Sequence, residues 1–294
     1  MDAQTHTFGT ILVPLDGSAL AEQAMPLAGR LASATESSML LVRVVGPISP
    51  PLTFPNGTAP AEIYQAVFDA EKQAVQDYLA QQQQVMRKYE IPVQTLISYG
   101  VAELSLLDLM ERPDIGLVVM TTHGRTGLAR FALGSVADRL ARGGTKPVLL
   151  LRAFDHAGPT ELVDRALVPL DGSTRAEQAL PLVQKLAGRV LREVRLVRVI
   201  APDATAEEEE VAQQYLIHAR ERLLQHLGEN ACGVTIDVLR DPVSEQLLQV
   251  AESGGEMVIM TTHGRTGPTR WVLGSVADRV VYGAHVPVLL VRAS

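Results

Sequence analysis

The chain has 294 residues, of which 47% are hydrophobic and only 4% aromatic, and its formal net charge at pH 7 is −7. Surfaces that bind nucleic acid need a basic footprint for the phosphate backbone, so this acidic balance argues against a nucleic-acid partner. No apolar run approaches the roughly 20 residues that span a bilayer, and the N-terminus shows no basic-then-apolar signal, so we expect a cytoplasmic protein without a membrane partner.

Apolar runs and helical patterns alternate along the first half. Helices are expected from about residue 18, where apolar positions recur at helical spacing, and over 61–88, 102–111 and 135–141. Pro26 lies inside the first helix and predicts a kink there. Strands are expected over 9–15, 38–45, 92–98, 116–120 and 147–152. This alternation favours an α/β fold with an open parallel sheet and helices on both faces.

The second half repeats the first. VPLDGS occurs at 13–18 and at 168–173, and fifteen of nineteen positions are identical between 121–139 and 261–279. The offset falls from 155 to 140 between these motifs, which places about fifteen extra residues in the first half, most simply in the Pro- and Gly-rich stretch 46–59. We therefore predict two tandem domains, 1–152 and 163–294, joined by a linker over 153–162, each with its own five-stranded sheet.

A repeated glycine loop suggests a phosphate site in each half. Each copy follows an apolar strand and ends in Gly-Ser at a predicted helix start, where free N–H groups and the helix dipole favour anions. In open α/β sheets, ligands bind beyond the carboxyl ends of the strands. The first strands end at Asp16 and Asp171, which can accept a hydrogen bond from ribose or help hold a phosphate-bound metal. The second strands end at Val44 and Val199, whose backbone can pair with an adenine edge.

On these motifs the chain resembles the universal stress proteins. Nucleotide-binding members of that family carry Gly, two residues, Gly, nine residues, Gly and then Ser or Thr; here threonine replaces the first glycine in both halves. The resemblance implies strand order 3-2-1-4-5 and ATP, with Mg²⁺, as the ligand. The implied nucleotide-binding set is Pro14, Asp16, Val44, Thr121, Gly124, Arg125, Gly134, Ser135 and Val136, and in the second half Pro169, Asp171, Val199, Thr261, Gly264, Arg265, Gly274, Ser275 and Val276.

Plainer roles stay open for several of these residues. The glycines suit a turn, the serines suit helix N-caps, the aspartates suit a helix bridge, and Arg125 and Arg265 suit solvent as well as phosphate.

Three functions follow from these observations. The favoured one is an ATP-binding regulatory stress-response protein. The first alternative is a slow Mg-dependent ATP hydrolase or nucleotidyl-transfer enzyme, although the chain has no G-x-x-x-x-G-K-[ST] motif. The second is a nucleotide-free scaffold. Relatives commonly dimerise through their last strands, so we expect 147–152 and 287–292 to pair within the chain as an internal pseudo-dimer, with a homodimer left open.

Overall fold

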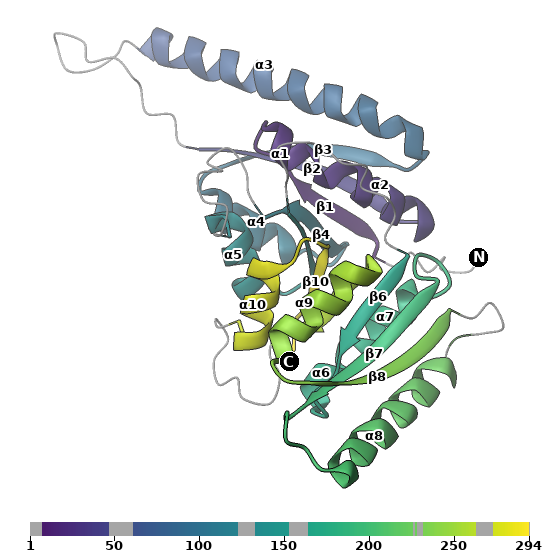
Figure 1. The fold of residues 1–294 in the computed structure, drawn as a ribbon. Helices are drawn as coiled ribbons and strands as arrows, with labels where there is room; N and C mark the ends of the chain where they lie inside the picture. Colours follow the sequence, from purple (N-terminus) through teal and green to yellow (C-terminus); the bar gives the residue numbers. More distant parts are fainter. Residues whose placement is uncertain are drawn as a thin grey trace.

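Ten strands form one sheet that runs through both halves of the chain (Figure 1). The structure is a computed structural model, and it describes residues 8–46, 61–122, 133–152, 164–225, 227, 232–262 and 273–293. The expected loop over 46–59, apart from Gly46, and the expected linker over 153–162 lie outside these ranges. The strand order is β3-β2-β1-β4-β5-β10-β9-β6-β7-β8. Each half therefore has the order 3-2-1-4-5, which confirms the expected fold class.

All strand pairs within a half are parallel. The strands of the first half are β1 (Thr10–Pro14), β2 (Ser38–Val45), β3 (Val93–Tyr99), β4 (Ile115–Thr121) and β5 (Val148–Leu151). Those of the second half are β6 (Arg165–Pro169), β7 (Glu193–Ile200), β8 (Gly233–Arg240), β9 (Met257–Thr261) and β10 (Val288–Val291).

The two halves meet where β5 and β10 pair antiparallel, with Leu149 opposite Leu289. This is the pairing expected for two short apolar strands whose unpaired edges need cover. It fuses the two five-stranded sheets into one. Because this central pair is antiparallel, the carboxyl ends of the strands point one way in the first half and the opposite way in the second.

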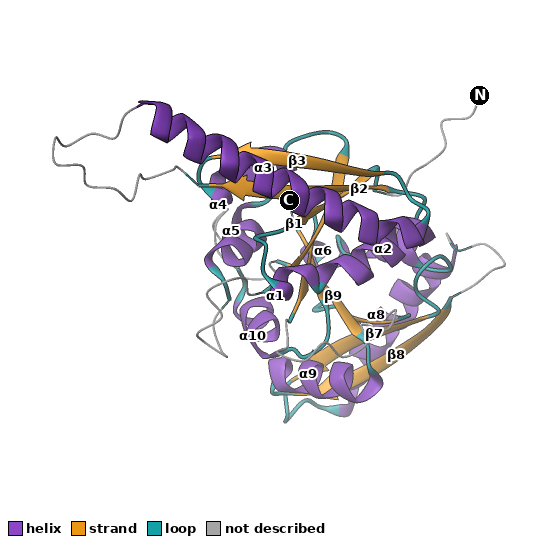
Figure 2. Ribbon diagram, turned by 90° about the horizontal axis from the view of Figure 1, so that it is seen from above, coloured by secondary structure: helices purple, strands orange, loops and turns teal. Residues whose placement is uncertain are grey.

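Helices cover both faces of the sheet, as Figure 2 shows from above. One face carries α1 (Ala19–Glu22), α2 (Ala24–Ala34), α3 (Ala61–Met86), α6 (Thr174–Glu177), α7 (Leu180–Leu186) and α8 (Ala206–Gln225). The other carries α4 (Ala102–Met110), α5 (Ser135–Gly143), α9 (Val243–Gly254) and α10 (Ser275–Gly283). Alternate residues of β5 enter different cores: Leu149 packs on the first face and Leu150 on the second. Each core contains residues from both halves.

The first helix of each half is interrupted rather than kinked. Gln23 separates α1 from α2, and Pro26 is the third residue of α2. Because proline has no N–H, it cannot donate to the carbonyl of Glu22, and the helix restarts after α1. In the second half, α7 begins at Leu180 with Pro181 in its first turn. The expected kink is therefore a break in both halves.

Candidate functional site

Among the described residues, a pocket lies at the carboxyl ends of the strands in each half, with a volume of about 210 Å³ in the first half and about 220 Å³ in the second. Fourteen of the fifteen lining positions carry the same residue type in the two pockets, and only Ala102 is replaced, by Val243. The first pocket is lined by Pro14, Leu15, Asp16, Ala21, Val42, Val44, Ala102, Leu106, Met120, Thr121, Thr122, Gly134, Ser135, Val136 and Ala137.

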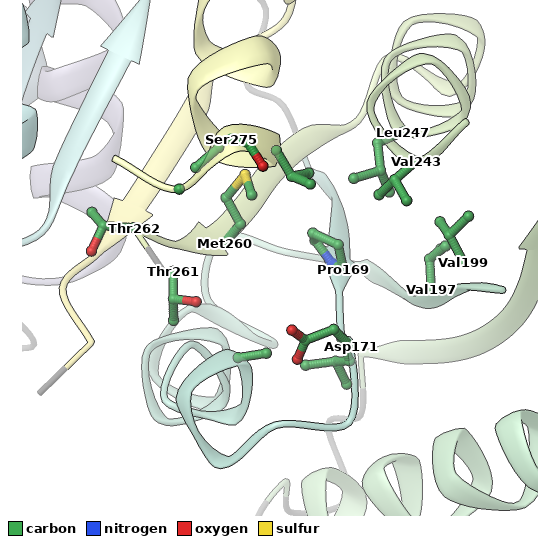
Figure 3. A pocket seen from close by; sticks show the side chains of 15 residues that line it. Pro169, Asp171, Val197, Val199, Val243, Leu247, Met260, Thr261, Thr262 and Ser275 are labelled. Atoms are coloured by element: carbon green, nitrogen blue, oxygen red, sulfur yellow. The ribbon is translucent and has the colours of Figure 1, made fainter. Parts of the chain in front are cut away.

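One side of each pocket is apolar and the other polar. Figure 3 shows the second pocket, with Val197 and Val199 of β7 and Leu247 of α9 on one side. Thr261, at the end of β9, and Ser275, at the start of α10, lie on the opposite side. A flat apolar group and a charged or polar group of one ligand can therefore occupy the two sides at once.

An aspartate stands in the wall of each pocket, where the first strand ends. One carboxylate oxygen of Asp16 accepts hydrogen bonds from the N–H of Ser18 at 2.9 Å and from its hydroxyl at 2.5 Å. Ser18 in turn caps α1, since its Oγ accepts the N–H of Ala21 at 3.1 Å. Asp171 and Ser173 make the same contacts at 2.9 and 2.6 Å. The expected helix-bridging role is present, and the same aspartates line the pockets.

A backbone hydrogen bond joins the two ends of each glycine loop. The N–H of Gly134 donates to the carbonyl of Thr122 at 2.7 Å, and Gly274 donates to Thr262 at 2.8 Å. Gly134 is the N-cap of α5 and Gly274 that of α10, and neither helix has a side-chain cap. Because glycine has no side chain, the first-turn N–H groups of these helices have no N-cap side chain as acceptor, unlike those of α1, which has Ser18. A helix start of this kind favours an anion.

Ser135 has a partner that Ser275 does not share. The Ser135 hydroxyl donates to a carboxylate oxygen of Glu103 at 2.9 Å. Glu103 is the second residue of α4, and the second residue of α9 is Ser244. The two helix starts, otherwise alike, thus differ by one acidic neighbour.

Fourteen of the eighteen candidate residues from the sequence line the two pockets. The other four, Gly124, Arg125, Gly264 and Arg265, lie outside the part of the chain that the structure describes. The apolar walls were anticipated only at Val44 and Val199. Leu106 and Leu247, one turn into α4 and α9, also face the pockets, and their sequence pattern is that of ordinary core leucines. The paired valines Val42 and Val197 were likewise expected only as strand residues.

Within the described ranges, no three or more His, Cys, Asp or Glu side chains are placed to share a metal ion. The same ranges contain no helix that is both long and apolar enough to span a membrane.

Comparisons with known proteins agree on one family. The model of the universal stress protein family matches residues 7–152 and again 163–292. A universal stress protein of Mycolicibacterium smegmatis is 28% identical over 305 residues, covering 98% of this chain and 99% of that protein. One from Mycobacterium tuberculosis is 31% identical over 189 residues, covering 60% of this chain and 62% of the relative.

A solved structure shows the same fold over nearly the whole length. The crystal structure of a universal stress protein from Archaeoglobus fulgidus superposes with a TM-score of 0.73 at 17% identity, covering 97% of this chain and 99% of that one. With two consecutive family matches, two α/β halves and this structural likeness, the chain belongs to the universal stress protein family.

Proposed function

We propose that this stress protein is regulated by adenine nucleotides, ATP foremost, with one bound in each pocket. The observation that carries the proposal is the repeated grouping at one sheet edge of an apolar wall, an aspartate and a helix start without a side-chain cap. Each part suits a different part of a nucleotide. Their recurrence in both halves, at fourteen of fifteen lining positions, is not expected of an incidental surface hollow.

The proposed pose follows from the chemistry of the walls. The adenine ring lies between Val42 and Val44 of β2 and Leu106 of α4, where its faces meet apolar side chains. The ribose lies beside Asp16, whose carboxylate accepts a hydrogen bond from a sugar hydroxyl. The phosphates lie over the first turn of α5, where backbone N–H groups and the helix dipole offset their charge. A pocket of about 210 Å³ encloses the base and sugar and leaves the phosphates at its polar mouth.

Mg²⁺ enters the proposal only together with the phosphates. This cation is usually bound by one or two carboxylates plus phosphate oxygens. Each pocket offers one aspartate, and one oxygen of that side chain already accepts two hydrogen bonds. The donor set fits a phosphate-bound cation better than a separate metal site. Bound Mg²⁺ would offset phosphate charge, while Asp16 and Asp171 would orient the ligand.

Regulation requires two states of the protein that bind ATP with different affinities. The antiparallel β5–β10 pair joins the halves as a pseudo-symmetric unit, and we propose that nucleotide binding acts on this unit or on its association with a second copy.

Calorimetric titration of nucleotide-stripped protein with Mg·ATP tests the proposal. We expect two sites per chain. Val44→Trp and Val199→Trp each place a large ring in one pocket and should each leave one site. Val85→Trp changes an exposed residue of α3 and serves as the matched control, with two sites retained.

Two results would count against this reading. Absence of binding to the unsubstituted protein would leave the nucleotide-free scaffold as the function. Steady-state phosphate release that exceeds a protein-free control, and that falls in Asp16→Asn, would instead favour the hydrolase.

A further inference from the structure

The two pockets match in lining but differ in charge beside the helix start. Glu103 places a carboxylate against α5, with its oxygen 2.9 Å from the Ser135 hydroxyl. The equivalent residue of α9 is Ser244, which is 5% exposed and uncharged. The first site therefore has an acidic side chain where the proposed phosphates lie, and the second has none at that position.

The other acidic groups at the two helix starts are balanced. Asp138 of α5 and Asp278 of α10 both pair with Arg142, at 2.7 and 2.8 Å. Asp16 and Asp171 make the same contacts in their own halves. Among the described residues that contact either helix start, α5 or α10, Glu103 is thus the acidic group without an equivalent. The second half has Asp241 where the first has Gly100, and its carboxylate accepts the N–H of Val243 at 2.7 Å, at the start of α9.

A glutamate on α9 does not restore the balance. Glu245 follows Ser244 and is exposed. It occupies the position of Leu104 on α4, a side chain that is 54% exposed. That position points to solvent in the first half, whereas Glu103 is held against Ser135.

We infer that Glu103 is a specificity residue that makes the first site discriminate against nucleoside polyphosphates that lack a bound divalent cation. The inference rests on the proposed function. Two physical effects act together: the carboxylate repels phosphate oxygens, and Ser135 must release Glu103 before its hydroxyl can donate to phosphate. A like charge about 5 Å away in high-dielectric surroundings weakens binding roughly fourfold. Chelation by Mg²⁺ reduces the negative charge of the ligand, so the two sites should differ less in their affinity for the nucleotide.

The test uses the full chain carrying Val199→Trp, so that the first site alone is titrated. Glu103→Gln keeps the size of the side chain and an acceptor for Ser135 while removing the charge. We expect Glu103→Gln to tighten ATP binding in EDTA roughly fourfold, with adenosine binding unchanged. This gain in ATP affinity should be smaller at high salt, where exposed charges are screened. It should also be smaller when the ligand is Mg·ATP.

Glu111→Gln is the matched control, since it makes the same charge change at the other end of α4 and should leave ATP affinity as it was. Equal ATP affinity in Glu103→Gln and its parent would overturn the inference while leaving the proposed function intact. So would an equal gain for adenosine, because adenosine has no phosphate. Failure of unsubstituted protein to bind either ligand at either site would refute the proposed function and the inference together.

Discussion

Replacing Leu289 by alanine tests whether the two halves are one cooperative unit. Leu289 is 1% exposed and lies in β10 between Leu149 of β5 and Ile259 of β9. Removing three buried carbons costs roughly 2.4 kcal/mol at about 0.8 kcal/mol each. The cavity left between two paired strands raises the expected loss of unfolding free energy to about 3–4 kcal/mol. Since the core around Leu289 contains residues from both halves, both should unfold together.

Urea unfolding followed by far-ultraviolet circular dichroism measures this loss. We expect a single transition in both proteins, moved to lower urea in Leu289→Ala. Val211→Ala is the control: Val211 is 59% exposed on α8, and its truncation should change stability by no more than about 0.5 kcal/mol. Two separated transitions, or a loss below about 1 kcal/mol for Leu289→Ala, would refute the reasoning that β5 and β10 merge the halves.

Three other substitutions give distinct outcomes. Arg142→Met removes the ion pairs with Asp138 and Asp278. Because these groups are partly exposed, the free energy of unfolding should fall by about 1 kcal/mol at low salt and by less at high salt. An unchanged thermal unfolding temperature at low salt would contradict this. Ser18→Ala removes the cap of α1 and the hydroxyl that donates to Asp16. Urea unfolding should show that the free energy of unfolding falls by about 1 kcal/mol. Unchanged stability would argue against the cap. Burial raises the pKa of Glu256, despite its ion pair with Arg195. A raised pKa in the folded state gives stability that is present below the unfolded pKa and lost as pH rises through the folded one. Glu256→Gln should therefore be more stable than the unsubstituted protein at pH 7, with a flatter profile between acidic and neutral pH; lower stability at pH 7 would show that the ion pair outweighs burial.

Regular periodicity made most of the fold predictable. The second strand was expected over 38–45 and is observed as Ser38–Val45, because the run is short and mostly apolar, rich in Val and Leu, with Arg43 as its one charged residue. The pairing of β5 with β10 was expected from the resemblance to relatives that dimerise through their last strands, and from the open edge that two short apolar strands would otherwise leave. The break at Gln23 was not predicted in that form. A proline pattern shows that a hydrogen bond is lost, but neighbouring packing decides whether the helix bends or restarts.

The polar parts of the candidate site were predictable, whereas its apolar wall was predicted only at Val44 and Val199. Asp16 and Ser135 follow strands or begin helices, and parallel topology brings such positions to one edge. Leu106 lies at a helical spacing shared by core residues, so nothing in the sequence separates a pocket wall from a core contact. The bond between Ser135 and Glu103 joins residues 32 positions apart. A local sequence pattern cannot predict this contact, because the contact depends on how α4 packs beside α5.

The geometry of the central strands limits how one pocket can influence the other. The antiparallel β5–β10 pair turns the two carboxyl edges in opposite directions, so a single nucleotide cannot bridge both pockets. One route between the pockets that the described residues provide runs through α5, about 13 Å long at 1.5 Å per residue. Its first turn faces the first pocket, while Arg142 in its last turn pairs with Asp278 of α10. Arg292 of the second half also donates to the carbonyls of Arg142 and Gly144 at 3.0 Å. A rigid-body shift of this short helix at the first pocket would move Arg142 and so reach α10 through these contacts.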